Sequence, residues 1–208
     1  CFMLDYVDLS DTENVIASDD LIDFAKENGF YKEYNGKFHA ALSYGEELET
    51  GNRDRLWGGI NFLAPELNIP YDAEVFPLFF KPSEKISLKD VMELQRYRYE
   101  GTERDPETAT DEVRVIGTER QAECHILQFK DEYPTDLGGL MWLAMGNAEH
   151  SVYLPTYGNI TDTNEGYKVK TADYDSNSAY WKFRGLSTLA ELNREKYGQS
   201  VRDFWSKY

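Results

Sequence analysis

Cys1 is the residue whose type and position most directly offer chemistry. A cysteine in first position carries its nucleophilic thiol and a free α-amine on one residue. The reference pKa of such an amine is about 8, so it can act as the base for its own side chain. Cys1 is therefore a candidate catalytic nucleophile. The alternative is that Cys1 only marks where the chain was cut or numbered, and position alone does not decide between the two.

A second group of candidate residues, Arg98, Glu100 and Thr102, lies where a predicted helix ends. An arginine can hold a carboxylate in a bidentate fork, and a glutamate can hold an amine. A peptide with free termini offers both groups, which makes these residues candidates for substrate binding. The alternative is an exposed helix end with local charge pairs. Arg114, in a predicted strand over residues 113–116, is a further candidate anion contact, with an edge-strand charge as its alternative.

Cys124 and His125 are adjacent, but their spacing argues against a catalytic pair. Neighbouring side chains of a strand point to opposite faces, so a strand over residues 123–129 would separate them. Cys124 is expected to be a small core residue and His125 a structural histidine. The three histidines show no metal-ligand spacing, and no HExxH, CxxC pair or glycine-rich phosphate loop is present. We therefore expect neither a metal nor an organic cofactor.

The composition of the chain argues against two classes of binding partner, nucleic acids and membranes. The chain has a formal net charge of -16 and no basic patch, so we expect it not to bind nucleic acid. No apolar run approaches the ~20 residues of a membrane span, so a membrane is not expected either. Two cysteines among 208 residues favour a reducing, cytoplasmic compartment. Secretion stays open, because a leader need not be visible in a sequence that begins at Cys1.

The predicted elements follow the order helices, strands, helices. Ser18 is expected to cap a short helix that ends at Gly29, and Gly58-Gly59 are expected to break a second helix within 52–67. Ser87 and Asp90 form a capping box for a helix that should run to Tyr99. The remaining predictions are strands over 1–9, 113–116, 123–129, 139–145 and 151–155, irregular structure over 30–53, and helices over 180–197 and 201–205. This order predicts an α+β fold in a single domain, 1–208, with a helical C-terminal region, 158–208.

One stretch, GGLMWLAMGNAEHSVYLPTY over residues 138–157, is the most informative part of this pattern. Two apolar runs flank a polar break at residues 146–150, which predicts two buried strands joined by a short connection.

Together with Arg98-Tyr99-Glu100-Gly101-Thr102, this stretch resembles the cysteine dipeptidases of the dipeptidase A type. These enzymes are related to the secernins and, more remotely, to the choloylglycine hydrolases. Softer matches occur over residues 14–18, 24–29 and 55–57, so that the resemblance spans most of Phe2 to Tyr157.

The resemblance implies an N-terminal nucleophile hydrolase fold, an αββα sandwich of two stacked sheets between helical layers. It implies a peptide hydrolase that cleaves dipeptides or short peptides through a thiol nucleophile and an acyl-enzyme, without a cofactor. Arg114 is the nearest counterpart of the arginine that lies beside the nucleophile in related amidases.

The start of the chain departs from this family pattern. The family's nucleophile begins a Cys-Thr-Thr-like strand, whereas Cys1 is followed by Phe2-Met3-Leu4-Asp5. The chain is therefore expected to be the later part of a dipeptidase, a fragment or one processed chain. Its sandwich would then be incomplete and would need an upstream chain or a homo-oligomer. The alternative is a noncatalytic peptide-binding or secernin-like module on the same fold.

Overall fold

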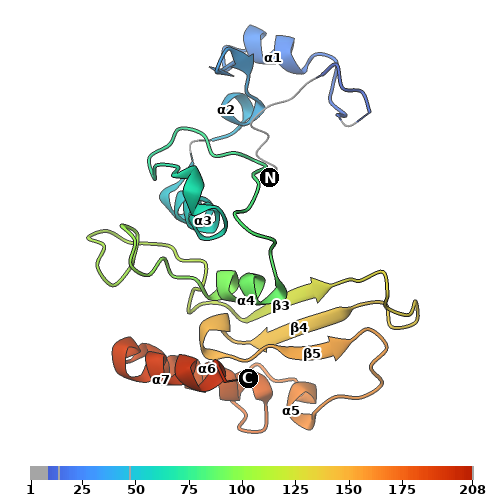
Figure 1. Cartoon of the computed structure of the whole chain (residues 1–208), viewed down its shortest axis with the longest axis vertical. Coiled ribbons are helices and arrows are strands. Elements are labelled where there is room, and N and C mark those ends of the chain that lie inside the picture. The colour runs from blue at the N-terminus through green and yellow to red at the C-terminus, as the bar shows by residue number, and fades with distance from the viewer. Residues whose placement is uncertain (1–8, 14, 47, 208) are drawn as a thin grey trace. The chain divides into compact units, whose positions relative to one another are not determined.

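The computed structural model describes residues 9–13, 15–46 and 48–207 (Figure 1). Cys1, and all of the strand expected over residues 1–9 except Leu9, lie outside the described residues. The contacts divide the chain into two compact units, Cys1–Glu84 and Lys85–Tyr208. Helices and strands are mixed, which is compatible with the expected α+β class. A single domain over 1–208 and a sandwich of two stacked sheets stay predictions.

The first unit begins with α1 (Leu21–Glu27), which starts later than expected. Asp20, rather than Ser18, is its N-cap residue, and Ser18 contributes its carbonyl oxygen to the Leu21 N–H. The sequence predicted irregular structure over residues 30–53, and this prediction is wrong. These residues hold a hairpin of β1 (Glu33–Tyr34) and β2 (Lys37–Phe38), then α2 (Ala40–Tyr44). Asn35 and Gly36 both have positive φ, at 53° and 73°, the backbone that a tight two-residue hairpin turn requires.

Helix α3 (Thr50–Leu63) continues through Gly58 and Gly59, which corrects the predicted break. Each glycine costs about 1 kcal/mol relative to alanine in a helix. Burial of Trp57 and Ile60 offsets this cost, and the Trp57 indole N–H donates to the Ile69 carbonyl at 3.1 Å. The helix ends before Pro65, which opens the short 3-10 helix η1 (Pro65–Leu67).

The second unit opens with α4 (Leu88–Arg96), whose capping box is confirmed. The Ser87 hydroxyl accepts the Asp90 N–H at 3.2 Å, and Asp90 accepts the Ser87 N–H at 2.7 Å. The helix ends at Arg96 and not at Tyr99. Tyr99 has a φ of 65° and is fully buried, with its hydroxyl donating to the Arg114 carbonyl. Burial of this ring outweighs the helical spacing of the sequence.

The second unit holds a three-stranded antiparallel sheet in the order β3-β4-β5. Strands β3 (Glu123–Gln128) and β4 (Leu140–Met145) confirm two predictions, whereas β5 (Leu154–Tyr157) begins three residues later than expected. Residues 113–116 form no strand. They are held to the segment after α4, where the Gly117 N–H donates to the Tyr97 carbonyl at 2.9 Å. The buried core of this unit comprises Cys124, Ala144, Ala148 and Tyr153, with Met92, Ile126 and Trp142 packed against it.

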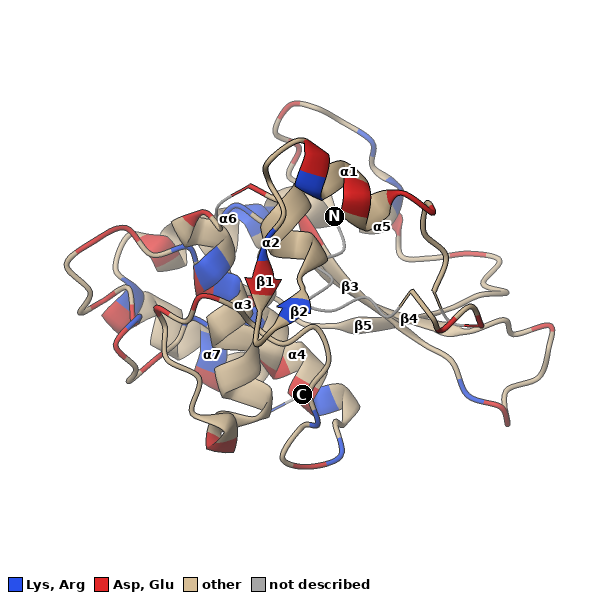
Figure 2. Cartoon of the chain, turned by 90° about the horizontal axis from the view of Figure 1, so that it is seen from above, with Lys and Arg blue, Asp and Glu red and all other residues tan. Residues whose placement is uncertain are grey.

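The last third of the second unit is helical, with α5 (Glu165–Lys168), α6 (Ala179–Glu191), the π-helix η3 (Arg194–Gly198) and α7 (Gln199–Trp205). The helix predicted over 180–197 thus ends early and changes its geometry. Both α6 and α7 contact η2 (Ala148–His150), the short helix that connects β4 to β5 (Figure 1). Acidic residues occur on helices and loops throughout the described chain (Figure 2). No helix among the described residues is long and apolar enough to cross a membrane.

Candidate functional site

The connection between β4 and β5 places charged side chains inside the second unit. Glu149 is 2% exposed, and His150 and the preceding Asn147 are fully buried. Asn147 caps η2, since its side-chain oxygen accepts the His150 N–H at 3.2 Å. Buried charge is costly unless it is paired, so this connection depends on partners from elsewhere in the chain.

Glu149 receives two guanidinium groups from the C-terminal helices. Oε1 of Glu149 lies 2.5 Å from Nη2 of Arg194 in η3, and it also accepts Nη1 of Arg202 in α7. A third arginine, Arg98, has its Nε 4.0 Å from Oε2 of Glu149. Burial opposes the charge of Arg194, but Glu149 and Glu191 together outweigh that effect and raise the pKa of the guanidinium. Arg194 therefore keeps its charge and joins the β4–β5 connection to the C-terminal helices.

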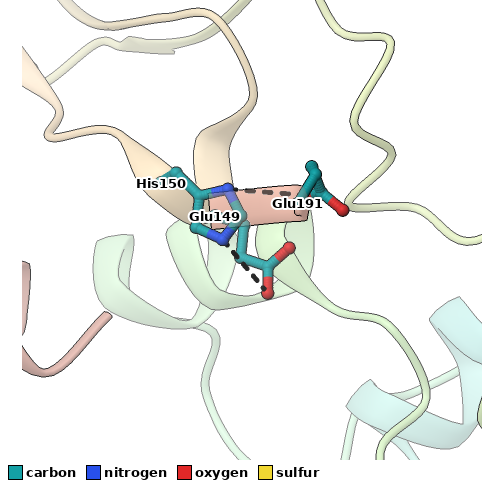
Figure 3. A group of neighbouring side chains, drawn as sticks. All are labelled: Glu149, His150 and Glu191. Atoms are coloured by element: carbon teal, nitrogen blue, oxygen red, sulfur yellow. Dashed lines mark ion pairs between the residues drawn. The ribbon is translucent and has the colours of Figure 1, made fainter. Parts of the chain in front are cut away.

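The His150 ring lies between two glutamates, one beside each nitrogen (Figure 3). Nε2 is 3.9 Å from Oε1 of Glu149, and Nδ1 is 3.6 Å from Oε1 of Glu191. Nδ1 also lies 3.4 Å from the Ser187 hydroxyl. Burial lowers the pKa of His150 below its usual value, and it outweighs the two carboxylates, which act in the opposite direction. His150 is thus held neutral.

Glu149, His150 and Glu191 offer ligand atoms within 4.8 Å of one another, a spacing that a metal ion could use. The same carboxylates are already engaged by arginine. Nη2 of Arg194 contacts Glu149, and its Nη1 lies 2.6 Å from Glu191. A divalent cation would meet this guanidinium at close range, so the chemistry of the donor set fits an ion-pair network better than a metal centre.

Arg98 and Glu100 lie beside this network, at the end of the segment that follows α4. Arg98 is 8% exposed, and its Nη1 donates to the Gly117 carbonyl at 3.1 Å. Glu100 is exposed and accepts the Arg98 N–H at 3.2 Å. The Thr102 hydroxyl donates to the Tyr99 carbonyl at 2.7 Å, which shapes the turn at Gly101 rather than leaving that hydrogen for a ligand.

A pocket of about 440 Å³ opens here, entirely within the second unit. Its lining brings together the segment after α4, the loop that follows it, η3 and α7. The lining residues are Arg98, Glu100, Asp105, Pro106, Glu107, Arg194, Glu195, Gln199 and Arg202. Two of the three predicted substrate-binding residues thus share one pocket, and Thr102 is not among the lining residues.

The predicted catalytic residues are not brought to this pocket. Cys1 lies outside the described residues, and the exposed Arg114 is not among the lining residues. Cys124 is buried in the core, where burial and the charge of Glu123 raise the pKa of its thiol to about 11. It is therefore protonated at neutral pH and a poor nucleophile. His125 is exposed on the opposite face of β3 from Cys124, and its Nδ1 lies 3.0 Å from Oε2 of Glu123. This confirms that Cys124 and His125 do not pair.

Sequence reasoning missed Arg194 and Arg202, which line the pocket, and the buried Glu149 that pairs with both. It also missed Arg96, whose Nε donates to the Ala148 carbonyl at 2.9 Å and thereby holds the connection. One signal was available. A glutamate and a histidine sit in a connection between two apolar strands, and such residues are buried only when they are paired.

Comparison with known sequences gives the class of protein. The sequence profile of Peptidase family C69 matches residues 2–207, and the chain belongs to this family. The resemblance noted in the sequence is thus confirmed, and the match extends past Tyr157 through the C-terminal helices.

Three relatives show how the chain compares with individual proteins. It is 36% identical over 217 residues to the probable dipeptidase B of Streptococcus pyogenes serotype M1, covering 97% of this chain and 44% of that protein. It is 30% identical over 200 residues to the probable dipeptidase B of Lactococcus lactis, covering 93% and 41%. A probable dipeptidase of Salmonella dublin is 34% identical over 161 residues, covering 74% and 37%. The chain thus spans less than half the length of the relatives it matches.

Proposed function

We propose that this chain belongs to a cysteine-type dipeptidase that hydrolyses short peptides, and that the pocket beside Arg98 binds the substrate. Family membership and the names of the relatives support the reaction class. The observation that carries the binding role is the presence of Arg98 and Glu100 in the lining of one pocket.

The pocket has the size and the chemical groups that a short peptide requires. Its volume of about 440 Å³ falls in the range of about 300–1,000 Å³ that is typical of small-molecule sites. The guanidinium of Arg98 would receive the α-carboxylate, and the carboxylate of Glu100 would receive the α-amine. A longer peptide would place uncharged amide groups where these charges lie. Recognition of both termini therefore favours dipeptides over proteins.

The proposed chemistry uses a thiol. The thiolate attacks the scissile carbonyl carbon, the C–N bond breaks, and the amine leaves with a proton. Water then attacks the thioester, which releases the acid and restores the thiol. Cys1 is retained as a candidate nucleophile, and Arg114 as a candidate contact for the developing oxyanion. The high pKa of Cys124 argues against that thiol.

The proposed fold is a sandwich in which β3-β4-β5 forms part of one sheet. Both β3 and β5 are edge strands within the described sheet. Leu127, on the His125 face of β3, is 57% exposed, and Phe129, directly after the strand, is 71% exposed. Further strands or a second sheet layer, from another chain or another copy of this one, would cover these groups.

The test is a comparison of peptides that differ in their termini. The purified protein is assayed both as this chain and as the complete product of its gene. The substrates are Ala-Ala, Ala-Ala-Ala, and Ala-Ala that is N-acetylated or C-amidated. We expect kcat/KM to be at least tenfold higher for the free dipeptide, which is the effect of about one charge-assisted contact at each terminus. If blocked dipeptides are cleaved equally well, the assignment of Arg98 and Glu100 fails. Binding of free dipeptides without hydrolysis would favour the noncatalytic module instead.

A further inference from the structure

We infer that the pocket beside Arg98 selects peptides whose side chain carries a positive charge, such as lysyl or arginyl dipeptides. This inference rests on the proposed function and adds a substrate class to it. It follows from how the charges on the pocket wall are paired.

The arginines of the pocket are largely engaged by carboxylates. All three guanidinium nitrogens of Arg194 lie near a glutamate oxygen: Nε is 3.3 Å from Glu107, Nη1 is 2.6 Å from Glu191 and Nη2 is 2.5 Å from Glu149. Arg202 is similarly occupied, because its Nη1 contacts Glu149 and its Nη2 donates to the Gln199 side chain at 2.6 Å. An anionic side chain of a substrate could therefore pair with Arg194 or Arg202 only by displacing a glutamate.

Three carboxylates of the lining, in contrast, have no cationic partner among the described residues. Glu195 is exposed and makes no ion pair with a described residue. Glu100 accepts the backbone N–H of Arg98. Asp105 accepts the backbone N–H groups of Gly101 and Glu107, at 2.9 and 3.0 Å. Their negative charge is therefore not neutralised by a neighbouring side chain.

A buried oxygen behind the arginines points in the same direction. Oε2 of Glu149 is shielded from solvent and accepts no hydrogen bond within the described part of the chain. Its nearest recorded cation is Nε of Arg98, at 4.0 Å. A buried carboxylate oxygen without a donor is costly, so a hydrogen-bond donor is missing at this atom. The pocket thus has carboxylates without a cationic partner on its surface and, behind it, a carboxylate oxygen without a donor.

An added ammonium or guanidinium group on the substrate would correct this imbalance. It would meet the carboxylates of Glu195 and Asp105 while the α-amine stays at Glu100 and the α-carboxylate stays near Arg98. An added carboxylate would face Glu195 and Asp105 and be repelled. We therefore expect kcat/KM to fall in the order cationic, neutral, anionic side chain.

The experiment compares three dipeptides that differ in the charge of one side chain: Ala-Lys, Ala-norleucine and Ala-Glu. Norleucine has nearly the shape of lysine without the charge. We expect kcat/KM to be about tenfold higher for Ala-Lys than for Ala-norleucine, the change that one charge-assisted contact supplies. Glu195→Gln should lower this ratio to about threefold, and Glu195→Gln combined with Asp105→Asn should bring it close to one.

Asp131→Asn serves as the matched control. It removes one negative charge from an exposed position on the β3–β4 loop, outside the pocket lining. If Asp131→Asn lowers the ratio as much as Glu195→Gln does, long-range attraction by the acidic chain explains the preference and the inference is wrong. A ratio near one in the unmodified protein, with all three dipeptides hydrolysed, would also overturn it while leaving the dipeptidase function intact.

Direct binding tests the inference if no dipeptide is hydrolysed, the result that would defeat the proposed function. Lysinamide and norleucinamide are titrated by calorimetry into the protein and into Glu195→Gln. Tighter binding of lysinamide, weakened by the substitution, supports charge selection at this pocket. Equal binding of the two amides contradicts it.

Discussion

Glu149 and Arg194 meet at 2.5 Å although 45 residues separate them in the sequence. Glu149 belongs to the connection between two strands, and Arg194 begins the π-helix after α6. Since the carboxylate is buried and the guanidinium lines the pocket, this pair joins the core of the second unit to its candidate site. The stability of the second unit and substrate binding should therefore both depend on the Glu149–Arg194 pair.

Replacing Glu149 should strongly destabilise the second unit. Glu149→Gln leaves the guanidinium groups of Arg194 and Arg202 without their shared anion. Breaking a buried ion pair in this way costs about 3–5 kcal/mol. Urea denaturation followed by circular dichroism measures the loss. Glu191→Gln is the control, because Glu191 is more exposed at 23% of its side chain and should cost less. Equal losses for the two variants would show that the burial of Glu149 carries no special weight.

The stability of the second unit should fall as the pH drops below about 6.5. Burial lowers the pKa of His150 in the folded chain, so the unfolded chain binds a proton first. Stability rises with pH wherever the unfolded state binds more protons. The contribution of neutral His150 is therefore complete above the unfolded pKa and is lost as the pH falls through the window below it.

Thermal unfolding at pH 7.5 and pH 5.5 tests this dependence. The decrease should be smaller in His150→Asn, which cannot take up the proton. It should persist in His125→Asn, because His125 is exposed. A decrease of the same size in both variants would assign the effect to other groups.

The capping box of α4 should contribute about 1 kcal/mol. Ser87→Ala removes the acceptor for the Asp90 N–H, and it also removes the hydroxyl that donates to the Asp90 carboxylate at 2.7 Å. The hydrogen bonds that the Ser87 hydroxyl and the Ser87 N–H donate to the Asp90 carboxylate hold the pKa of Asp90 below its usual value. Ser87→Thr keeps a hydroxyl acceptor and should restore most of the stability measured by urea denaturation. If Ser87→Thr is as unstable as Ser87→Ala, the cap is not the source of the loss.

Arg98 should control recognition of the substrate carboxylate. Arg98→Lys keeps the positive charge but loses the bidentate fork, so KM for a free dipeptide should rise about tenfold with a smaller change in kcat. The corresponding dipeptide amide lacks the carboxylate and should show little change in KM. A purely structural role for Arg98 predicts equal changes for both substrates. Steady-state kinetics with the two peptides separates these outcomes.

Local sequence patterns predicted much of the fold of the second unit. Ser87 and Asp90 predicted a capping box, and apolar runs predicted β3 and β4, because these features depend on neighbours in the sequence. The dipeptide Asn35-Gly36 is also a local turn signal, which the prediction of irregular structure over residues 30–53 overlooked. The end of α4 was missed because burial of Tyr99 overrides helical spacing, and no local pattern reports that burial.

The candidate site was only partly visible in the sequence. Arg98 and Glu100 could be singled out together because one residue separates them. Their surroundings could not, since Arg194 and Arg202 reach Glu149 across 45 and 53 residues. No spacing rule links such positions, and only the fold brings them together. Glu195 has no ion-pair partner within the described part of the chain, and this becomes meaningful only once its neighbours are known to be paired.

The most direct measurement of the central claim is covalent labelling of the thiol during dipeptide hydrolysis. The complete gene product is treated with iodoacetamide, and the residual activity is compared with the modified cysteine found by peptide mass spectrometry. We predict that activity falls in proportion to modification of one thiol other than Cys124, and that free dipeptide protects this thiol. Loss of activity that follows modification of Cys124, or full activity after every accessible thiol is alkylated, would contradict a cysteine-type dipeptidase.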